Sequence, residues 1–523
     1  MHDSHDIPLE PTLAVDDSVS PPEPPEKVRY MPGNCALLIG PGEVLVKRLE
    51  GLKVVGLRPA LLCTDLANPG PLPRGLRVLT GHPAAITGWM GAFYAWIDTA
   101  RGREDLAPLS WHADGHFDWV LDFSGLDRPA APPQGWYSLR ADDYPAFKAA
   151  LLEIARHLRE GYEKPRYFRL EASMCAHRRQ GVAGCHACLT VCPAGAIRSD
   201  KEAVSIEPYL CQGCGTCALV CPGGAVRHVV PGTAHQIGRL ARMLSAWRSA
   251  GGGETGLWIV GHASGDVAPG GWLPFRIDEA PSLGAEFWLA ALTMGCRRVA
   301  IDVAGLPVES RRAIETQLAW CRSLLAGLGY PPALGLAETA GELAGIPSMP
   351  ELAPTDLTPE DDKRLLLFAA LDALVREPAA APSFELPAGP LGEVRIAADR
   401  CTLCAACVRL CPTGALSLPG STTQLAFTEE KCLQCGLCAE GCPEQAVSLV
   451  PRLLVDPAAR RAPRVVAEAE PYACTACGKP FATRAQIARS QALMADHPMF
   501  QGDNARLMEM CPDCRQRAMI GAL

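Results

Sequence analysis

The chain has 523 residues, 48% of them hydrophobic, and a formal net charge of −8 at pH 7. This length exceeds what one hydrophobic core supports, so we expect about three to five domains. The acidic balance and the lack of long basic blocks argue against nucleic-acid binding, and no apolar run reaches the ~18 residues of a membrane-spanning helix.

Residues 1–27 are acidic and rich in proline, which predicts a disordered tail. The chain begins MHDSHD, with neither the basic region nor the apolar stretch of an export signal. The chain has 24 cysteines, many at metal-type spacings, and without a signal they favour a reducing compartment over disulfide bonding. We therefore expect a cytoplasmic protein.

Residues 28–160 alternate between strand and helix patterns, which predicts an N-terminal α/β domain. The expected strands and the amphipathic helix are Cys35–Gly40, Val54–Leu57, Trp119–Phe123 and Ala146–Leu158. The piece Gly40-Pro41-Gly42 follows a strand as a phosphate loop would, but it lacks the third glycine and the acidic partner of a dinucleotide fingerprint, which favours a plain turn. Cys35 and Cys63 are expected to be buried thiols rather than ligands.

Residues 161–232 contain two cysteine runs that each end in proline. One run has the spacing C-x2-C-x2-C-x3-C-P and consists of Cys211, Cys214, Cys217 and Cys221. The other is a variant, in which nine residues separate the first two of Cys175, Cys185, Cys188 and Cys192. Gly181 and Gly184 allow this longer loop to turn, so we expect Cys175 to bind metal together with the other cysteines. The alternative is that His177 or His186 takes its place, and histidine ligation would raise the reduction potential of an iron–sulfur cluster bound there.

Residues 233–376 again alternate helix and strand patterns, which predicts a central α/β domain with a partly parallel sheet. The expected elements are a helix at His235–Ser249, a strand at Leu257–Val260, a helix at Ala285–Thr293, a strand at Val299–Val303 and a helix at Arg311–Ala326. Asp302, Glu309 and His262 are expected to be structural. Residues 377–391 are rich in proline and alanine, which predicts a stiff linker.

Residues 392–452 contain two more runs with the spacing C-x2-C-x2-C-x3-C-P. They consist of Cys401, Cys404, Cys407 and Cys411, and of Cys432, Cys435, Cys438 and Cys442. Short apolar segments flank every run and predict small hairpin strands. Zinc binding or a disulfide framework is the competing interpretation, but three closely spaced cysteines and a fourth before a proline are typical of iron–sulfur ligand sets.

The spacing predicts which thiolates share a cluster. Three cysteines on one loop hold three corners of a [4Fe–4S] cubane, and the fourth, before the proline, binds the other cluster of the pair. We therefore expect four [4Fe–4S] clusters, with the ligand sets Cys175, Cys185, Cys188 and Cys221; Cys211, Cys214, Cys217 and Cys192; Cys401, Cys404, Cys407 and Cys442; and Cys432, Cys435, Cys438 and Cys411.

The last region, residues 453–523, holds two separated cysteine pairs, each with turn residues. The pairs are Cys474 with Cys477, and Cys511 with Cys514. Two such pairs predict a zinc-ribbon-like domain with one structural Zn²⁺, and a helix is expected between them at Thr483–Met494. A rubredoxin-like single iron, disulfides or free thiols are the alternatives.

Three resemblances follow from these residues. The paired runs resemble the bacterial-type dicluster ferredoxin family, present twice. The segment Ser282–Ala285 with Gly295–Arg298 weakly resembles the delta-subunit domain of hydrogenase and heterodisulfide-reductase complexes, but only Cys296 and Cys321 remain there, so no fifth cluster is expected. The segment Gly81–Gly88, the piece Met174–His177 and the double ferredoxin layout resemble the large cytoplasmic 4Fe–4S binding proteins that proteobacteria carry beside formate dehydrogenase-type molybdoenzymes.

The overall prediction is an α/β multidomain protein with two dicluster ferredoxin modules and a zinc-ribbon-like C-terminal domain. The favoured function is single-electron transfer through the four clusters between redox protein partners, which the last resemblance extends to a formate dehydrogenase-type enzyme. Two alternatives stay open: an oxidoreductase subunit with its own flavin or substrate site in an α/β domain, and a maturation factor for a redox enzyme. No complete flavin, nicotinamide or molybdopterin fingerprint is present in the sequence.

Overall fold

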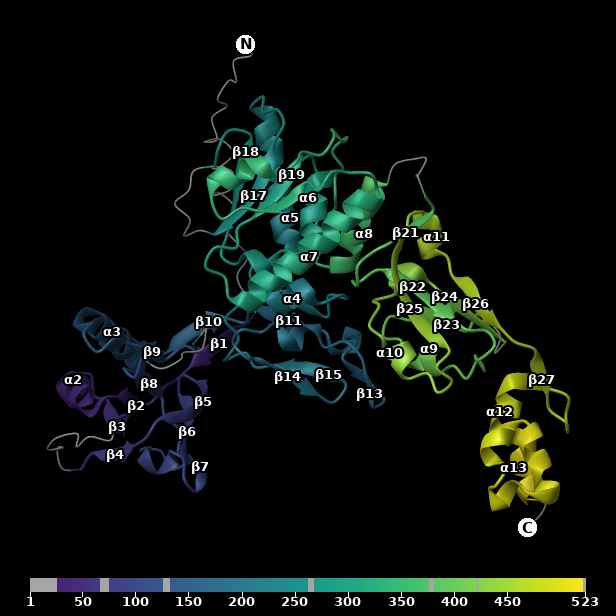
Figure 1. Cartoon of the computed structure of the whole chain (residues 1–523), viewed down its shortest axis with the longest axis horizontal. Helices are drawn as coiled ribbons and strands as arrows, with labels where there is room; N and C mark the ends of the chain where they lie inside the picture. Colours follow the sequence, from purple (N-terminus) through teal and green to yellow (C-terminus); the bar gives the residue numbers. More distant parts are fainter. Residues whose placement is uncertain are drawn as a thin grey trace.

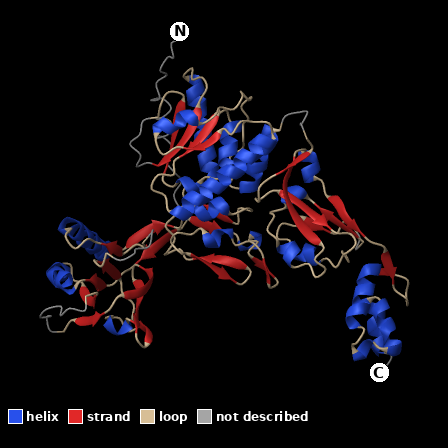
Figure 2. Cartoon of the chain, in the orientation of Figure 1, coloured by secondary structure: helices blue, strands red, loops and turns tan. Residues whose placement is uncertain are grey.

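The computed structural model describes residues 26–65, 75–125, 132–261, 268–375, 381–420 and 423–520. The N-terminal α/β domain and the C-terminal cysteine-containing unit lie at opposite ends of the molecule, with the cysteine runs and the central α/β domain between them (Figure 1). Helices and strands are mixed within both α/β domains (Figure 2). Residues 1–25 of the predicted tail and His262 lie outside the described residues.

The N-terminal domain is built on a five-stranded parallel sheet with strand order β4-β3-β2-β8-β9. Its strands are β2 (Cys35–Gly40), β3 (Arg58–Cys63), β4 (Arg77–Thr80), β8 (Trp119–Asp122) and β9 (Trp136–Ser138). Helices α2 (Gly42–Val54) and α3 (Tyr144–Glu160) pack on it, and an antiparallel sheet of β5 (Pro83–Trp89), β6 (Ala92–Thr99) and β7 (Gly102–Asp105) follows β4. Strand β1 (Lys27–Tyr30) pairs with β10 (Tyr162–Pro165).

The strand predicted at Val54–Leu57 is wrong. Leu45, Leu49 and Leu52 form one buried helical face, so α2 continues to Val54 and the strand begins only at Arg58. The first helical N–H, that of Gly42, donates to the carboxylate of Asp65 at 2.8 Å. A side chain of this chain therefore occupies the place that a phosphate would take, which agrees with a plain turn at residues 40–42.

The central domain has a four-stranded parallel sheet with strand order β18-β17-β19-β20. The strands are β17 (Gly256–Gly261), β18 (Trp272–Ile277), β19 (Arg298–Ile301) and β20 (Leu334–Leu336). The helices are α5 (Thr233–Ser249), α6 (Ala285–Thr293), α7 (Val308–Gly327) and α8 (Lys363–Leu374). All nine residues of α6 are buried, and its packing against α8 forms part of the largest core cluster. The five predicted elements of this region are present, and β18, β20 and α8 are additions that the sequence analysis did not predict.

The cysteine runs are enclosed by short antiparallel strands and one-turn helices. Around the first two runs these are β11 (Phe168–Leu170) with β16 (Val226–His228), β12 (Arg178–Arg179) with β13 (Val182–Ala183), β14 (Ile197–Asp200) with β15 (Ala203–Ile206), and α4 (Thr216–Val220). Around the last two they are β22 (Gly392–Ile396) with β25 (Val447–Leu454), β23 (Leu416–Ser417) with β24 (Gln424–Phe427), α9 (Ala406–Leu410) and α10 (Leu437–Glu440).

Two further strands extend the sheets of the second module. Strand β21 (Ser383–Glu385), within the predicted linker, pairs with β25, and β26 (Arg464–Glu468), within the predicted zinc-binding region, pairs with β24. Helix α11 (Pro457–Arg461) lies between β25 and β26. The terminal cysteines follow in a unit made of β27 (Pro471–Ala473), β28 (Pro480–Thr483), α12 (Arg484–Met494) and α13 (Pro512–Ile520).

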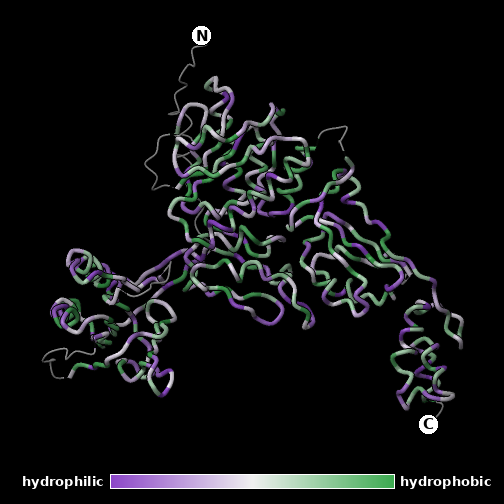
Figure 3. Tube along the Cα trace, viewed as in Figure 1, coloured by the Kyte–Doolittle hydropathy of each residue, from purple (hydrophilic) through white to green (hydrophobic). Residues whose placement is uncertain are grey.

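Hydrophobic and hydrophilic residues are interspersed along the coloured parts of the trace (Figure 3). Among the described residues, no helix combines the length and the apolar character that crossing a membrane requires.

Candidate iron–sulfur and zinc centres

The structure gathers the sixteen cysteines of the four runs into four groups. Three groups each line one cavity: Cys175, Cys185, Cys188 and Cys221; Cys401, Cys404, Cys407 and Cys442; and Cys411, Cys432, Cys435 and Cys438. In the fourth group, removal from water raises the pKa of Cys217, and the nearby thiols of Cys211, Cys214 and Cys192 raise it further, ahead of the more distant Cys188. Each group therefore combines three thiols of one run with the fourth thiol of its partner run.

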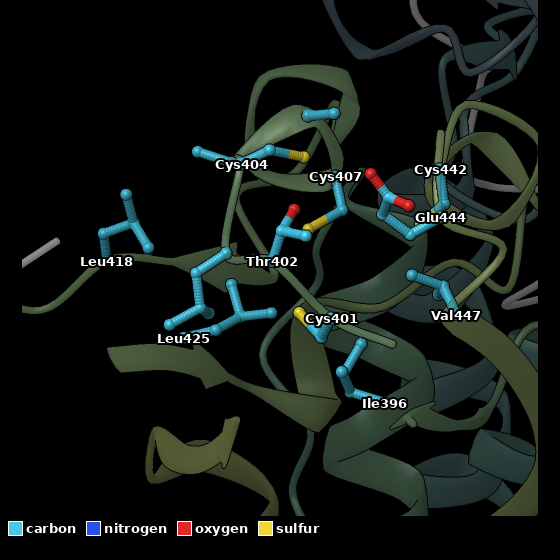
Figure 4. A pocket seen from close by; sticks show the side chains of 13 residues that line it. Ile396, Cys401, Thr402, Cys404, Cys407, Leu418, Leu425, Cys442, Glu444 and Val447 are labelled. Carbon is cyan, nitrogen blue, oxygen red and sulfur yellow. The ribbon is translucent and has the colours of Figure 1, made fainter. Parts of the chain in front are cut away.

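The cavity around Cys401, Cys404 and Cys407 shows how such a group is walled. The sulfur atoms of the three loop cysteines lie around one space, and Cys442 reaches its rim from the other run (Figure 4). Apolar side chains close it, including Ile396 from β22 and Leu425 from β24. Strands predicted beside the runs thus supply the walls, and the donor set and surroundings fit a cubane cluster.

Left-handed backbone conformations shape three of the four ligand loops. Two residues with positive φ flank the second cysteine of each loop: Gly213 and Gly215, Leu403 and Ala405, and Gln434 and Gly436. Such alternation lets successive N–H groups point to one side, where they form a concave site for anionic sulfur. The loop of Cys185 and Cys188 differs, because residues 187–190 form a 3₁₀ turn there.

A backbone N–H group also donates to the fourth sulfur of every run. Ala196 donates to Cys192 Sγ at 3.3 Å, Val226 to Cys221 at 3.4 Å, Ala415 to Cys411 at 3.2 Å and Ala446 to Cys442 at 3.3 Å. Hydrogen bonds to sulfur stabilise the thiolate and tune the potential of a cluster bound to it. The apolar segment after each proline therefore has a second role besides closing the hairpin.

Burial and neighbouring thiols raise the pKa of several of the grouped cysteines. Removal from water, followed by the nearby Cys221, Cys185 and Cys175, raises the pKa of Cys188 to about 12. Removal from water and the neighbouring cysteines likewise raise the pKa of Cys407 to about 12. A bound metal reverses this balance, since a coordinating thiol is deprotonated outright. Thiols grouped in this way are suited to binding a cationic cofactor.

The two histidines near the variant run are less well placed than Cys175 to be a ligand. Both ring nitrogens of His177 are engaged, Nδ1 with the carbonyl of Cys185 at 3.0 Å and Nε2 with Ser199 Oγ at 2.7 Å. His186 is exposed, whereas Cys175 lines the cavity with the other three thiols. The arrangement favours Cys175 over either histidine as the fourth donor.

The four C-terminal cysteines form a separate compact site. The sulfur atoms of Cys474, Cys477, Cys511 and Cys514 all lie within 4.8 Å of one another. Cys477 Sγ and Cys511 Sγ are 3.8 Å apart, and tetrahedral Zn²⁺ with Zn–S bonds of ~2.3 Å would place two sulfurs at about this separation. The first pair lies in the β27–β28 turn, where Gly478 has φ 74°, and the second pair begins α13.

Backbone groups favour the thiolate of Cys474. Although removal from water raises the pKa of Cys474, hydrogen bonds from the N–H groups of Cys511, Ala476 and Cys477 outweigh it and lower that pKa to about 6. The N–H of Cys511 is 3.2 Å from Cys474 Sγ. The predicted helix between the two pairs is confirmed as α12, with Thr483 forming a capping box with Gln486.

The remaining cysteines are buried and isolated from these groups. Cys35, Cys63, Cys296 and Cys321 are at most 1% exposed. Removal from water raises the pKa of Cys296 to about 12, so these thiols behave as small apolar side chains.

The sequence reasoning passed over one polar cluster, His112, His116 and Asp118, whose ligand atoms lie close together. The spacing His-x3-His-x-Asp is a signal that could have found it. Both carboxylate oxygens of the buried Asp118 accept backbone hydrogen bonds, from Gly33 at 2.7 Å and Cys35 at 2.8 Å, and His112 Nε2 lies 2.7 Å from Oδ2. This satisfied network anchors the entry to β2, and we assign it a structural role.

Comparison with known proteins locates the same regions. The family model of the 4Fe-4S dicluster domain matches residues 183–225 and again residues 400–446. The first match begins after Cys175, so the first cysteine of the variant run lies outside it. No curated protein matches the chain. The chain therefore contains two 4Fe–4S dicluster regions, and these support an iron–sulfur electron-transfer role.

Proposed function

We propose that the chain is an electron-transfer protein that holds four [4Fe–4S] clusters and passes single electrons between redox protein partners. The observation that carries the proposal is the crossed grouping of thiols, three from one run and one from its partner, around each site. Cubane clusters bound there would supply one-electron redox capacity. The chain itself supplies the thiolates, the N–H donors to sulfur and the apolar walls.

The proposal extends to zinc, partners and location. Structural Zn²⁺ at Cys474, Cys477, Cys511 and Cys514 is supported by the sulfur separations. A formate dehydrogenase-type molybdoenzyme is the partner that the sequence resemblance favours. A cytoplasmic location is proposed because cysteines that bind metal, and do not form disulfides, are typical of a reducing compartment.

Electron flow through the second module tests the proposal. We expect Cys404→Ala or Cys435→Ala to remove one cluster and to stop reoxidation of the dithionite-reduced module by a candidate acceptor, as followed by stopped-flow absorbance. Cys63→Ala, a buried cysteine outside the runs, and Asp302→Asn are matched controls that should keep normal electron transfer. Turnover of a substrate that is lost in Asp302→Asn with all clusters intact would instead indicate an enzyme.

A second function, a subunit with its own flavin or substrate site, is favoured by one cavity. It has a volume of about 710 Å³ and lies between α7, α8 and the loops of Cys185 and Cys435. Pockets of this size at domain interfaces commonly bind small molecules. The visible spectrum of anaerobically purified protein distinguishes the two: flavin bands beside the cluster absorbance favour this candidate, and cluster absorbance alone favours the carrier.

A further inference from the structure

The nine residues that separate Cys175 from Cys185 form a small hairpin. Strands β12 and β13 pair in antiparallel fashion, with Arg178 opposite Ala183 and Arg179 opposite Val182. Gln180 at φ 49° and Gly181 at φ 81° make the two-residue turn between them. Two consecutive residues with positive φ are the conformation that tight hairpins require. The insertion is therefore an ordered element added to an otherwise short ligand loop.

This hairpin contacts the second module as well as its own, where Arg178 N–H donates to the carbonyl of Glu202. Arg179 Nη1 donates to the carbonyl of Cys411 at 3.2 Å, and β13 packs against α10. A Cβ added at Gly441 would lie 3.3 Å from Val182 Cγ2. A buried apolar cluster also joins the two modules, with Ala176 from the first and Leu410, Leu433 and Leu437 from the second. The contact is thus both apolar and hydrogen-bonded.

One side chain of this cluster, that of Leu433, lies between two cysteine groups. Leu433 lines the cavity of Cys175, Cys185, Cys188 and Cys221, and it also lines the cavity of Cys411, Cys432, Cys435 and Cys438. A Cβ added at Gly223 would lie 2.9 Å from Leu433 Cδ1. Cys185 and Cys435, one from each group, also line a common cavity together with Leu433. The two cavities are therefore one side chain apart.

The central domain fixes both sides of this contact. Arg364 of α8 donates to the carbonyls of Glu430 at 2.7 Å and Cys432 at 3.0 Å, and to that of Pro222 at 3.5 Å. The adjacent Lys363 donates to the carbonyls of Ala218 and Leu219 in the first module, at 2.8 and 2.6 Å. A planar guanidinium with several donors can bridge separate loops in this way. The two modules are thus held at a set separation.

We propose that the junction formed by the hairpin 178–183 and Leu433 is the passage for electrons between the two ferredoxin modules. The proposal rests on the proposed function, because it presupposes clusters in both modules. One electron leaves the site of Cys175, Cys185, Cys188 and Cys221, and the same electron enters the site of Cys411, Cys432, Cys435 and Cys438. The external redox partners supply and remove it, so no other reactant is needed.

The junction orders all four sites along one path. Within each module the two ligand loops lie against each other, since α4 packs on the 3₁₀ turn at residues 187–190 and α9 packs on α10. The outermost sites are then those of Cys211 and Cys401. The rate of electron tunnelling falls steeply with distance. Because the hairpin joins the two modules, two separate pairs of sites become one continuous series of four sites.

The test measures magnetic coupling across the junction in the full chain. Removing two ligands from each outer site, with Cys211→Ala and Cys214→Ala in the first module and Cys401→Ala and Cys404→Ala in the second, leaves only the two junction sites. Half of the iron should remain. Electron paramagnetic resonance of the dithionite-reduced protein should then show an interaction spectrum, since the only remaining paramagnetic pair faces across Leu433. Two isolated signals would overturn the proposal while leaving the four-cluster carrier intact.

Two variants that each add one negative charge to β13 test the contact itself. In the variant with only the two junction sites, Val182→Asp should abolish the magnetic coupling. The new carboxylate would be buried against the apolar face of the second module, and the cost of burying it would separate the modules. Ala183→Asp places the same charge on the exposed, opposite face of the strand and should keep the coupling. Hydrogen exchange of residues 178–183 and 433–441 should rise in the first variant alone. Coupling that survives Val182→Asp with that rise in exchange would contradict the assigned role of the hairpin.

Shortening the loop provides an independent variant. Deleting residues 177–183 joins Ala176 to Gly184 and restores the x2 spacing of the other runs. In the full chain with all four sites, iron content should stay at the parent value while rapid electron passage from the first to the second module is lost. If iron is also lost from the first module, the shortened loop no longer binds its cluster. The magnetic coupling in Val182→Asp is then the measurement that tests the proposal. Unchanged passage would refute it.

Discussion

At the scale of single residues, the ligand loops depend on backbone conformation as much as on cysteine. In the loop of Cys401 and Cys404, both Leu403 and Ala405 adopt positive φ, 57° and 60°, where two other loops have glycine at one or both places. An L-residue in this conformation costs about 1 kcal/mol. The loop accepts that cost because its N–H groups then face the thiols.

Ala405→Gly should therefore stabilise the second module by about 1 kcal/mol, since glycine adopts positive φ freely. The urea midpoint for loss of iron–sulfur absorbance, measured anaerobically, reports the change. Ala406→Gly is the control: it lies at the start of α9, where glycine should lower the midpoint. Equal shifts for the two variants would contradict the left-handed conformation at residue 405.

Lys164 is a second residue with a specific expected effect. Its ammonium donates to the carbonyls of Cys211 at 2.6 Å and Tyr209 at 2.9 Å, and burial lowers its pKa to about 8. A positive charge beside the Cys211 site stabilises the reduced, more negative state of a bound cluster. Lys164→Met should therefore make that cluster's reduction potential more negative in a redox titration followed by electron paramagnetic resonance. The exposed Lys148→Met should leave the potential unchanged, and a positive shift in Lys164→Met would count against this assignment.

At the scale of elements, the long periodic helices and most of the short strands were predicted well, and two short segments were not. The helices at residues 146–158, 235–249, 285–293 and 311–326 follow apolar periodicity and are all present. The error at residues 54–57 arose because a short apolar piece can end a helix or form a strand, and periodicity alone does not decide between them. The hairpin at residues 178–183 has too few residues for any pattern, so the sequence indicated only that the loop can turn.

The C-terminal unit should depend on its metal for folding, because so small a domain has little core and metal binding supplies folding energy. Cys474→Ser, or treatment with a zinc chelator, should raise hydrogen exchange over residues 471–520. The iron–sulfur absorbance should be kept, although Thr483 and Gln486 donate to the carbonyls of Thr402 and Leu403 in a ligand loop. Loss of a whole cluster's signal in Cys474→Ser would mean that these thiols bind an iron–sulfur cluster instead.

At the scale of the whole molecule, the spacing of cysteines predicted which thiols meet within a module but not how the modules meet each other. Contacts between distant parts, such as Arg364 with Cys432, leave no periodic or spacing signal in one sequence. The crossed grouping was predictable because it follows from ligand chemistry. The order of the sites along the chain of modules required the structure.

Arg364→Met should lower the Tm of the whole assembly, because it leaves several backbone carbonyls without a donor and each costs about 1–3 kcal/mol when buried. Arg364→Lys should recover only part of the loss, since a single ammonium cannot reach both Pro222 and Glu430. Thermal unfolding followed by visible absorbance measures both. A full recovery with lysine would show that charge, and not the bridging geometry, is what matters at this position.

Metal content tests the central claim, that two dicluster modules and one C-terminal site are filled, most directly. Anaerobically purified or reconstituted protein should contain about 16 iron atoms and about one zinc per chain, because each cubane has four irons. Acid-labile sulfide should match the iron. A value near about eight iron atoms per chain, in fully reconstituted protein, would contradict the four-cluster account.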